Sequence, residues 1–430
     1  MPAAVDRAAD TMRIAIIGSG IAGLGAAYLL AREHEVVVYE AEDRLGGHTH
    51  THDIDGGSGK ISIDTGFIVF NPDHYPLLTR LFAELGVESQ PTTMSFAVKN
   101  ELSGLEYNAT NLNRLFCQRS NLLSPPFWRM VLDILRFYRE SPALLRDPGP
   151  GPSLGEYLRE HGYGRLFIED HLLPMASALW SSPTATILDF PARYLVQFMA
   201  NHQMLDAGNR PPWRVVKGGS ARYLDKLVPA IRGEFRTGAA VRRVERSENG
   251  VRVFSQGDES TFDQVVFACH SDQALAMLDD PSDSEREILG AIKFQRNDTV
   301  LHTDASLLPK RRAAWAAWNA LKLKPVPGAA EAPACTVSYC MNLLQSLSCS
   351  TPYIVTLNAT QRIAPERILA RMDYAHPVYT HASVAAQGRW SEINGLRRSW
   401  YCGAYWGWGF HEDGLRSGVR VASALGCRWD

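Results

Sequence analysis

Three glycines at the first turn of a strand–helix–strand pattern constrain the fold of this 430-residue chain more than any other feature. An apolar, β-branched run at 12–17 leads into Gly18-Ser-Gly20-Ile-Ala-Gly23, a helix-forming stretch follows, and a second apolar run ends on Glu40. Such glycines allow a tight turn and close approach of a diphosphate, which binds the N–H groups at the helix start, and the acid binds a ribose. The residues expected to line a dinucleotide here are Gly18, Gly20, Ile21, Ala22, Gly23, Glu40 and Ala41.

A second glycine-rich motif distinguishes a flavin from a nicotinamide cofactor. An arginine there offers a forked cation to a phosphate, and a glycine pair lets backbone amides touch a flat ring with no Cβ in the way. A nicotinamide dehydrogenase has no need of this pair, so the sequence predicts FAD. The motif consists of Arg44-Leu-Gly46-Gly47, followed by His48 and, further on, by Asp64-Thr-Gly66-Phe67.

These motifs resemble those of flavoproteins of the amine oxidase and phytoene desaturase superfamily. The resemblance implies an α/β fold, in which a Rossmann-like FAD-binding domain carries an inserted α+β substrate domain. It also implies that the arginine–glycine segment passes the FAD diphosphate and the flavin, with the Asp-x-Gly turn close by. The contacts implied are Arg44, Gly46, Gly47, His48, Asp64, Gly66 and Phe67.

Later segments extend the resemblance to the adenine and to the flavin ring. A strand at 238–244 is expected to pass the adenine, and one at 262–269 to support the nucleotide. A third strand, a glycine-rich turn and a helix that begins near residue 415 are expected beside the flavin, because a helix start stabilises the anionic reduced ring. Many relatives bind the ribityl chain with an acid that this chain replaces by Ala404, so Glu412, Asp413 or the backbone takes over. The contacts implied are Val241, Ala268, Gly403, Glu412, Asp413, Gly414 and Leu415.

The pattern of strands and helices predicts two domains, each built from separate segments. Residues 1–95, 210–285 and 395–430 form the FAD-binding domain. Residues 96–209 and 286–394 form the substrate-binding domain, the first as a helical insertion and the second as an antiparallel sheet.

Composition excludes several classes of protein. The net charge is −2, with 44 basic and 46 acidic residues, which argues against a nucleic-acid partner. Seven cysteines without CxxC spacing predict reduced thiols in a cytoplasmic protein. Residues 1–10 lack the apolar core of a signal peptide. His48, His50 and His52 alternate along the chain but lack further ligands, so no metal site is expected.

The expected reaction is a flavin-dependent dehydrogenation, in which a hydride passes to flavin N5 while a base removes a proton. His411 and Glu412 are the candidate bases, and Asn71 and Tyr405 are candidate positioning residues. An acid at 412 or 413 also fits a helix cap, the favoured alternative to direct chemistry.

Across nearly its full length the chain resembles a bacterial branch of FAD-binding proteins associated with cyclopropane-fatty-acid-synthase-like methyltransferases. The resemblance implies desaturation of a methylated unsaturated acyl chain or phospholipid to a methylated diene, a step in furan fatty acid synthesis. Two alternatives stay open: an amine oxidase and a redox-neutral lipid or carotenoid isomerase. Amine oxidases commonly place a lysine near flavin N5, and neither Lys217 nor Lys293 fits that role. The segments that carry the resemblance are Trp180-Ser181, Asn201-His202, Trp213-Arg214 with Gly218-Gly219, Tyr339-Cys-Met-Asn342 with Gln345, and Phe410–Gly414.

A lipid substrate raises the question of membrane contact. Residues 114–138 mix Leu, Phe and Trp with Arg, which is typical of a helix that lies on a bilayer surface. An ordinary helix packed on the domain core explains the same pattern. The sequence therefore leaves open whether the protein is purely cytoplasmic or also contacts the inner membrane peripherally.

Overall fold

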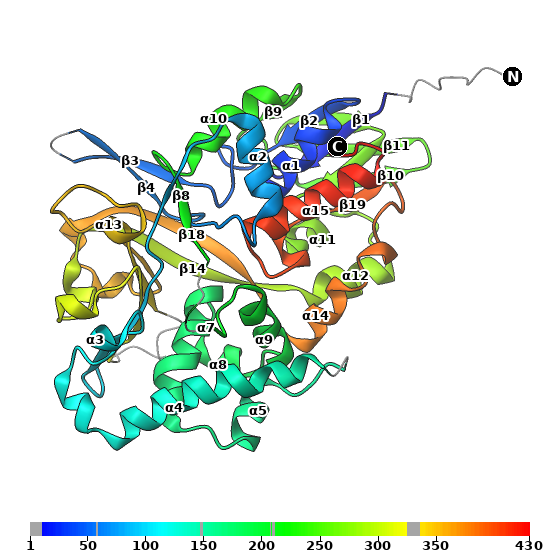
Figure 1. The fold of residues 1–430 in the computed structure, drawn as a ribbon. Helices are drawn as coiled ribbons and strands as arrows, with labels where there is room; N and C mark the ends of the chain where they lie inside the picture. Colours follow the sequence, from blue (N-terminus) through cyan, green and yellow to red (C-terminus); the bar gives the residue numbers. More distant parts are fainter. Residues whose placement is uncertain (1–10, 57–58, 147–148, 207, 209–210, 325–335) are drawn as a thin grey trace, which may run out of the picture.

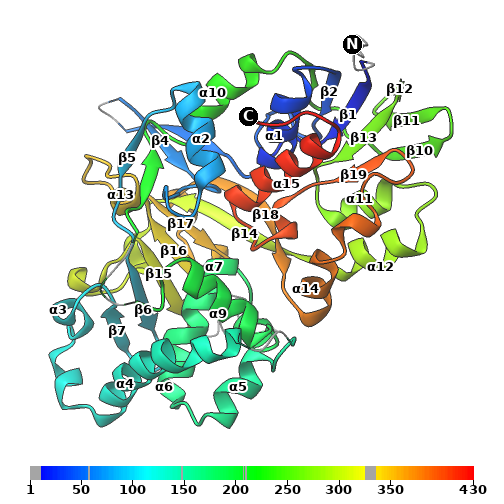
Figure 2. The same cartoon turned by 45° about the vertical axis from the view of Figure 1, so that its right-hand side comes forward.

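The computed structural model describes residues 11–56, 59–146, 149–206, 208, 211–324 and 336–430. The signal-peptide expectation for residues 1–10 lies outside this part of the chain. Two large sheets dominate the fold, one next to the C-terminus and one beside a group of helices (Figures 1 and 2). Within the described residues, no helix has the length and hydropathy needed to cross a membrane.

The first sheet has five strands, all parallel, in the order β19-β13-β1-β2-β9. Its central strands read as continuous runs of β-branched residues because both faces are covered. Ile14, Ile16 and Val38 pack into the core on one face, while Ile17 and Val37 pack into the core on the other. The strands are β1 Arg13–Ile17, β2 Glu35–Tyr39, β9 Glu234–Arg236, β13 Gln264–Phe267 and β19 Ser399–Tyr401.

Helices cover one face of this sheet, and a small antiparallel sheet lies on the other side. The helices are α1 Ile21–Leu30, α2 Pro76–Leu85, α10 Ala221–Ala230 and α15 His411–Ala424. The small sheet consists of β10 Arg243–Ser247, β11 Gly250–Ser255 and β12 Asp258–Phe262, and α11 Ser271–Met277 and α12 Asp283–Ala291 follow it.

The strand expected at 238–244 was misplaced by several residues, and the one expected at 262–269 is shorter than predicted. The first begins only at Arg243, since the chain leaves β9 through a loop that contains Val241. The second is β13, which begins at Gln264 in the five-stranded sheet, and Phe262 is the last residue of β12 in the small sheet.

The second large sheet has seven strands, in the order β18-β14-β17-β16-β15-β6-β7. All neighbours are antiparallel except β15 and β6. Its strands come from both segments predicted to form the substrate domain: β6 Phe96–Asn100, β7 Leu105–Asn108, β14 Lys293–His302, β15 Trp318–Lys322, β16 Val337–Cys340, β17 Ile354–Leu357 and β18 Ile368–Val378. The hairpin β3 Thr51–Asp55 with β4 Lys60–Asp64, and the pair β5 Ser89–Pro91 with β8 Arg214–Val216, are separate small sheets.

A layer of helices packs beside this sheet through an aromatic core that includes Tyr107, Phe137, Phe167 and Phe198 (Figure 2). The layer consists of α3 Leu112–Leu115, a 3-10 turn η1 Arg119–Leu123, α4 Pro125–Glu140, α5 Leu154–Glu160, α6 Arg165–Phe167, α7 Leu173–Trp180, α8 Thr184–Leu188 and α9 Ala192–Asn201. Two further helices, α13 Met341–Leu344 and α14 His381–Gln387, follow β16 and β18.

The two faces of the seven-stranded sheet differ in chemistry. One row of directly paired residues is apolar and runs Leu301–Val355–Tyr339–Trp318–Phe96. The neighbouring row, whose side chains point to the opposite face, contains Thr356, Ser338 and Asn319. Hydrogen bonds of 2.6 and 2.7 Å join the Thr356 hydroxyl to Ser338 Oγ and His302 Nε2. The apolar row therefore belongs to a hydrophobic core, in which Trp318 and Tyr339 are only half-buried.

His302 makes the stability of this sheet dependent on pH. Its Nδ1 accepts the Asp304 N–H at 3.1 Å, so Nε2 must carry the proton that bonds Thr356. Burial lowers the His302 pKa to about 4, although Asp304 acts in the opposite direction. In the unfolded chain the imidazole takes up a second proton below about pH 6.5, whereas the buried ring stays neutral until about pH 4. The free energy of unfolding therefore falls as the pH drops from 6.5 towards 4.

We therefore expect His302→Gln to show a shallower loss of thermal stability between pH 6.5 and pH 4 than the unchanged protein. The measurement is the melting temperature at constant ionic strength across that range. His381→Gln, at the exposed start of α14, is the matched control and should keep the original slope. Identical slopes for all three proteins would show that His302 does not contribute.

Candidate functional site

The three glycines of the first turn have three different environments. Gly18 has a φ of +109°, and an added Cβ would lie 2.8 Å from the Ala268 carbonyl oxygen. A Cβ on Gly23 would lie 2.0 Å from the Gly18 carbonyl oxygen, so only glycine lets α1 pack this close to the turn. A Cβ on Gly20 would meet no atom within 4 Å, although both neighbouring glycines are crowded. The backbone of Gly20 thus borders free space, as expected for a diphosphate site.

The start of α1 is prepared to bind an anion. No side chain caps it at Gly20, and its first turn contains no acid. The backbone N–H groups of Ile21 and Ala22 are among those left without an intrahelical partner, and they carry the positive end of the helix dipole. This arrangement fits the FAD diphosphate.

Ser19 connects the two glycine motifs, a role that the sequence analysis missed. Its hydroxyl donates to Glu40 Oε2 at 2.5 Å and accepts the Gly46 N–H at 3.1 Å. Its own N–H donates to the same Glu40 oxygen at 3.0 Å. These bonds hold the acid at the end of β2 beside the turn, where it is available to a ribose. A small polar residue between two turn glycines was the signal in the sequence.

The second motif lies directly against the first. A Cβ on Gly47 would lie 3.1 Å from the Gly20 Cα. Arg44 pairs with exposed Glu42 at 2.9 Å and donates to the Thr49 carbonyl at 3.2 Å. His48 Nε2 is buried and has no partner among the described residues, and burial lowers the pKa of this side chain to about 4. An unpartnered ring nitrogen next to this glycine pair fits a site that a phosphate or flavin completes.

The expected adenine contacts are compatible with the structure. Ala268 donates its N–H to the Ile17 carbonyl at 2.8 Å and lies beneath the first turn. Val241 is half-buried in the loop before β10, and no described group hydrogen bonds its backbone. The N–H of Ala239 donates to the Glu40 carbonyl at 2.8 Å, which keeps this loop beside the ribose acid and next to exposed Ala41.

Asp64 has a structural role in place of the cofactor contact expected of it. Its Oδ1 accepts from Thr51 Oγ1 at 2.6 Å and from the N–H and hydroxyl of Ser220 at 2.8 and 2.9 Å. Its Oδ2 accepts from Gln345 Nε2 at 3.2 Å. Burial raises its pKa to about 6 even with these donors. Asp64 therefore joins the start of α10 to the turn that carries Gly66, whose added Cβ would lie 2.1 Å from the His48 carbonyl oxygen.

The start of α15 meets this turn through His411. The imidazole stacks on the Phe67 ring with a centroid distance of 3.7 Å and an angle of 10°. Its Nε2 bonds Thr49 Oγ1 at 3.1 Å and Tyr223 OH at 3.0 Å. Burial lowers the His411 pKa to about 3, so the ring is neutral. The prediction that His411 is a base is corrected, because its Nε2 is already hydrogen bonded to Thr49 and Tyr223 and its ring packs against Phe67.

Glu412 and Asp413 are helix caps, which corrects their expected roles as base and ribityl ligands. The Glu412 oxygens accept the N–H groups of Leu77 and Leu78 at 3.1 and 3.0 Å, so this acid caps α2. Asp413 Oδ2 accepts the N–H groups of Trp408 and Phe410 at 3.1 Å each, within the first turn of α15 itself. Burial raises the pKa of both carboxyl groups. With both carboxylates paired inside the protein, the backbone is the favoured one of the three options for the ribityl contact, which stays a prediction.

The packing of α15 on α1 explains the remaining residues of this segment. A Cβ on Gly414 would lie 2.9 Å from Ile21 Cγ2, and one on Gly418 would lie 2.2 Å from the Ala22 carbonyl oxygen. The Leu415 side chain fills the space beside Gly25, so a contact with FAD is left to its backbone and stays a prediction. The N–H of Gly403 donates to Ser417 Oγ at 3.1 Å, which fixes the strand end against the same helix.

The two expected positioning residues do not meet one another. Asn71 Oδ1 accepts from the N–H and from Nδ1 of His74 at 2.9 and 2.7 Å, so Asn71 orients that imidazole ahead of α2. Tyr405 lies in the 3-10 turn η9 Ala404–Trp406 and packs with Phe294 in the core on the other side of the five-stranded sheet from Phe67. Tyr405 is therefore a core residue, which corrects the prediction that it positions the substrate.

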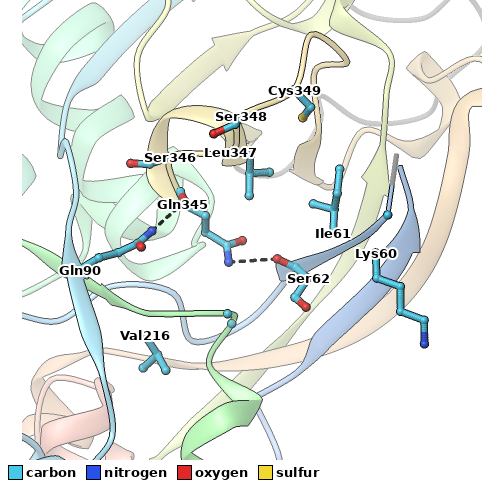
Figure 3. Close-up of a pocket in the computed structure, with 13 residues that line it drawn as sticks. Lys60, Ile61, Ser62, Gln90, Val216, Gln345, Ser346, Leu347, Ser348 and Cys349 are labelled. Carbon is cyan, nitrogen blue, oxygen red and sulfur yellow. Dashed lines mark hydrogen bonds between the residues drawn. The ribbon is translucent and has the colours of Figure 1, made fainter. Parts of the chain in front are cut away.

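Two pockets border these elements. One of about 370 Å³ lies between β4, β8 and the turn after α13, where Gln90 Nε2 donates to the Gln345 carbonyl at 3.1 Å and Gln345 Nε2 donates to the Ser62 carbonyl at 3.3 Å (Figure 3). The other, of about 280 Å³, lies at the start of α15. It is lined in part by His74, His202, Trp408, Phe410, Glu412 and Arg416.

The sequence signature of flavin-containing amine oxidoreductases matches residues 21–301. The chain belongs to this family. Its members are flavin-containing, which confirms the FAD cofactor and the class of FAD-dependent oxidoreductase. The amine-oxidase-like α/β fold is likewise confirmed.

Individual relatives are distant. A putative flavin-containing monoamine oxidase, AofH, from Mycobacterium tuberculosis is 26% identical over 288 residues, which are 63% of this chain and 60% of that protein. A fatty acid isomerase from P. acnes that produces CLA has a TM-score of 0.67 at 15% identity, over 96% of this chain and 98% of the other. Putrescine oxidase bound to putrescine has a TM-score of 0.66 at 15% identity, over 97% and 99%. At these identities the two structures show the shared fold alone.

Gly20→Val tests the diphosphate site. We expect the variant to fold, because an added Cβ meets no protein atom, but to lose bound FAD at least tenfold, because the side chain fills the space beside the start of α1. The measurement is the ratio of flavin to protein absorbance after purification, together with circular dichroism. Gly290→Ala, inside α12 where a Cβ has room, is the control and should retain FAD. A fully yellow Gly20→Val protein would contradict this placement.

Proposed function

We propose that this flavoprotein desaturates a neutral, apolar substrate, a methylated unsaturated fatty acyl chain carried by a lipid, and releases a methylated diene. The observation that carries the proposal is the state of the buried carboxylates. An amine substrate binds as a cation and is best matched by a buried carboxylate with free acceptor capacity. An acyl chain needs none.

Every buried carboxylate of the described chain already accepts hydrogen bonds from protein donors. Glu106 accepts the N–H groups of Lys310 and Arg311, and Asp170 accepts from Asn100 Nδ2. Asp133 accepts the Gly164 N–H, and Glu285 binds Arg246 and Tyr401. Asp64, Glu412 and Asp413 have the structural partners described above. The complete set of buried carboxylates is Asp64, Glu106, Asp133, Asp170, Glu285, Glu412 and Asp413.

The turn that carries Gly66 and Phe67 is called the flavin turn here, and the interior next to it suits a hydrocarbon. Ile68, which follows Phe67, packs in one core with Ala178 of α7 and with Val355 of the apolar row. Trp318 and Tyr339 of the same row are half-buried, and their rings meet edge to face at 5.3 Å. Burial of apolar surface contributes about 25 cal/mol per Å², so such walls favour an acyl chain over a solvated amine.

Three lysines, Lys99, Lys217 and Lys293, are poorly placed for the role of the lysine typical of amine oxidases. Lys217 is exposed and pairs with Glu88 at 3.0 Å, and Lys293 is exposed at the start of β14. Lys99 is buried, but its ammonium donates to the Ser306 carbonyl at 2.7 Å in the outer part of the sheet. These placements support a reaction that does not depend on a lysine.

Bound FAD supplies the hydride acceptor for this reaction, and the protein has to supply a proton acceptor. We assign that role to His202, at the end of α9. Its Nδ1–H donates a hydrogen bond to the Phe198 carbonyl at 3.0 Å, so Nε2 carries the lone pair. His202 lines the pocket at the start of α15 and stacks on His74 at 4.9 Å, whose orientation Asn71 fixes. Burial lowers the His202 pKa to about 4, so the ring is neutral at physiological pH.

In the balanced reaction one C–H hydride leaves the chain, an allylic proton passes to His202, and a C=C bond forms. The two electrons then leave to oxygen or to a carrier protein. A second candidate is a redox-neutral lipid isomerase, which the same apolar walls and neutral imidazole would also suit.

The decisive experiment is anaerobic mixing of the yellow protein with a methylated monounsaturated phospholipid. We expect flavin absorbance to bleach and the product to be lighter by two hydrogens. Putrescine serves as the contrasting substrate and should leave the flavin oxidised, because no buried carboxylate is free to bind its ammonium groups. A product of unchanged mass would favour the isomerase, and rapid bleaching by putrescine would contradict the proposal.

His202→Gln tests the proton acceptor. We expect kcat to fall by about 10²–10⁴, the usual contribution of a general base, with the flavin spectrum and FAD content unchanged. His381→Gln is the matched control, since this histidine lies at the exposed start of α14. Unchanged turnover in His202→Gln would remove this residue from the mechanism without affecting the substrate assignment.

A further inference from the structure

Helix α4 has an inner and an outer apolar face. Phe127, Met130 and Phe137 are buried and form part of the aromatic core of the helical layer. Trp128, Leu132 and Leu135 alternate with them and point outward, with exposed fractions of 42%, 63% and 52%. The helix therefore satisfies both interpretations of its sequence, because it packs on the core and also presents apolar side chains to its surroundings. It runs along the outer side of the helical layer (Figure 1).

The elements before α4 continue this exposed surface. Leu123 at the end of η1 is 89% exposed, and Leu112 at the start of α3 is 71% exposed. Ten large apolar side chains of the described residues are exposed, and six of them fall within residues 112–135. We call these six the α3–α4 surface: Leu112, Leu122, Leu123, Trp128, Leu132 and Leu135. Single exposed leucines are normal, but such a concentration marks an interaction site.

Arginines are interleaved with the α3–α4 surface. Arg114, Arg119, Arg129 and Arg139 are all exposed, and residues 112–140 contain five arginines but only two acids, although the whole chain has a net charge of −2. One of these acids, Asp133, is buried and accepts the Gly164 N–H. Arg114, within α3, and Arg119, at the start of η1, have no acidic partner among the described residues.

We propose that the α3–α4 surface docks the protein on an anionic lipid bilayer. Leucine and tryptophan side chains enter the boundary between headgroups and acyl chains, and arginines at the same level bind the phosphates. Trp128 has the amphipathic character favoured at this depth, and its indole N–H is already bonded to the Leu122 carbonyl at 2.9 Å. The helices that carry this surface also enclose the aromatic core next to the apolar sheet face, which places the substrate domain towards the lipid.

A second copy of the chain fits this surface poorly. In a symmetric dimer the same patch lies on both sides of the interface, so the arginines of one copy would face those of the other. Like charges brought together in this way are destabilising, whereas anionic headgroups complement them. The positive charge of the α3–α4 surface therefore favours an anionic membrane over a second copy of the chain.

Sedimentation with lipid vesicles tests the proposal. We expect the FAD-loaded protein to bind vesicles of phosphatidylglycerol and phosphatidylcholine, and to bind phosphatidylcholine alone at least tenfold more weakly. The double variants Leu123→Ser/Leu132→Ser and Arg114→Gln/Arg119→Gln should each lower binding at least tenfold. Leu396→Ser is the control, because Leu396 is 55% exposed but lies in the turn before β19, away from α4.

Flavin content shows that each variant is folded, and no substrate is present, so the outcome is independent of the proposed reaction. Equal binding of all variants, or no binding of the unchanged protein, would overturn the proposal. Light scattering provides a second readout. A dimer that Leu123→Ser/Leu132→Ser dissociates would identify the surface as a contact between copies and would also overturn it.

Discussion

The contact between α1 and α15 is the interaction on which the rest of the site depends. Gly414 and Gly418 bring α15 against Ile21 and Ala22, in the first turn of α1. Because residue numbers increase together along both helices, the helices are parallel and their starts lie side by side. The start of α1 is uncapped and free of acids, whereas Asp413 offsets part of the positive potential of α15. An anionic diphosphate is therefore best placed at α1, with α15 acting through shape and backbone groups.

This arrangement explains why the acids near the flavin turn have structural roles. Each of them lies where several N–H groups converge, at the start of α2, of α10 or of α15. A buried carboxylate without donors is costly, so these helix starts and these acids stabilise one another. Once they are paired, the acids are poor ligands for a substrate cation and poor bases. The chemistry left to the interior is that of neutral imidazoles and apolar walls.

The cofactor site could be predicted from the sequence because its glycines act locally. Gly18 and Gly23 are required by the backbone of a single turn, and no knowledge of distant segments is needed to recognise them. The roles of Glu412 and Asp64 could not be predicted in this way, since their partners lie far along the chain. Glu412 is 335 residues from the N–H group of Leu77 that it caps. The strand near Val241 was misplaced because β-propensity marks apolar runs, whereas pairing with β11 decides where β10 begins.

The seven-stranded sheet connects the cofactor to the choice of substrate. Its polar row is closed by hydrogen bonds among Ser338, Thr356 and His302, so it offers few groups to a ligand. Its apolar row faces the flavin turn through Ile68 and the helical layer through Ala178. Under the proposed function, a substrate held beside these residues would leave water and meet their apolar side chains. This apolar environment is the basis of the proposed preference for a hydrocarbon chain over a charged amine.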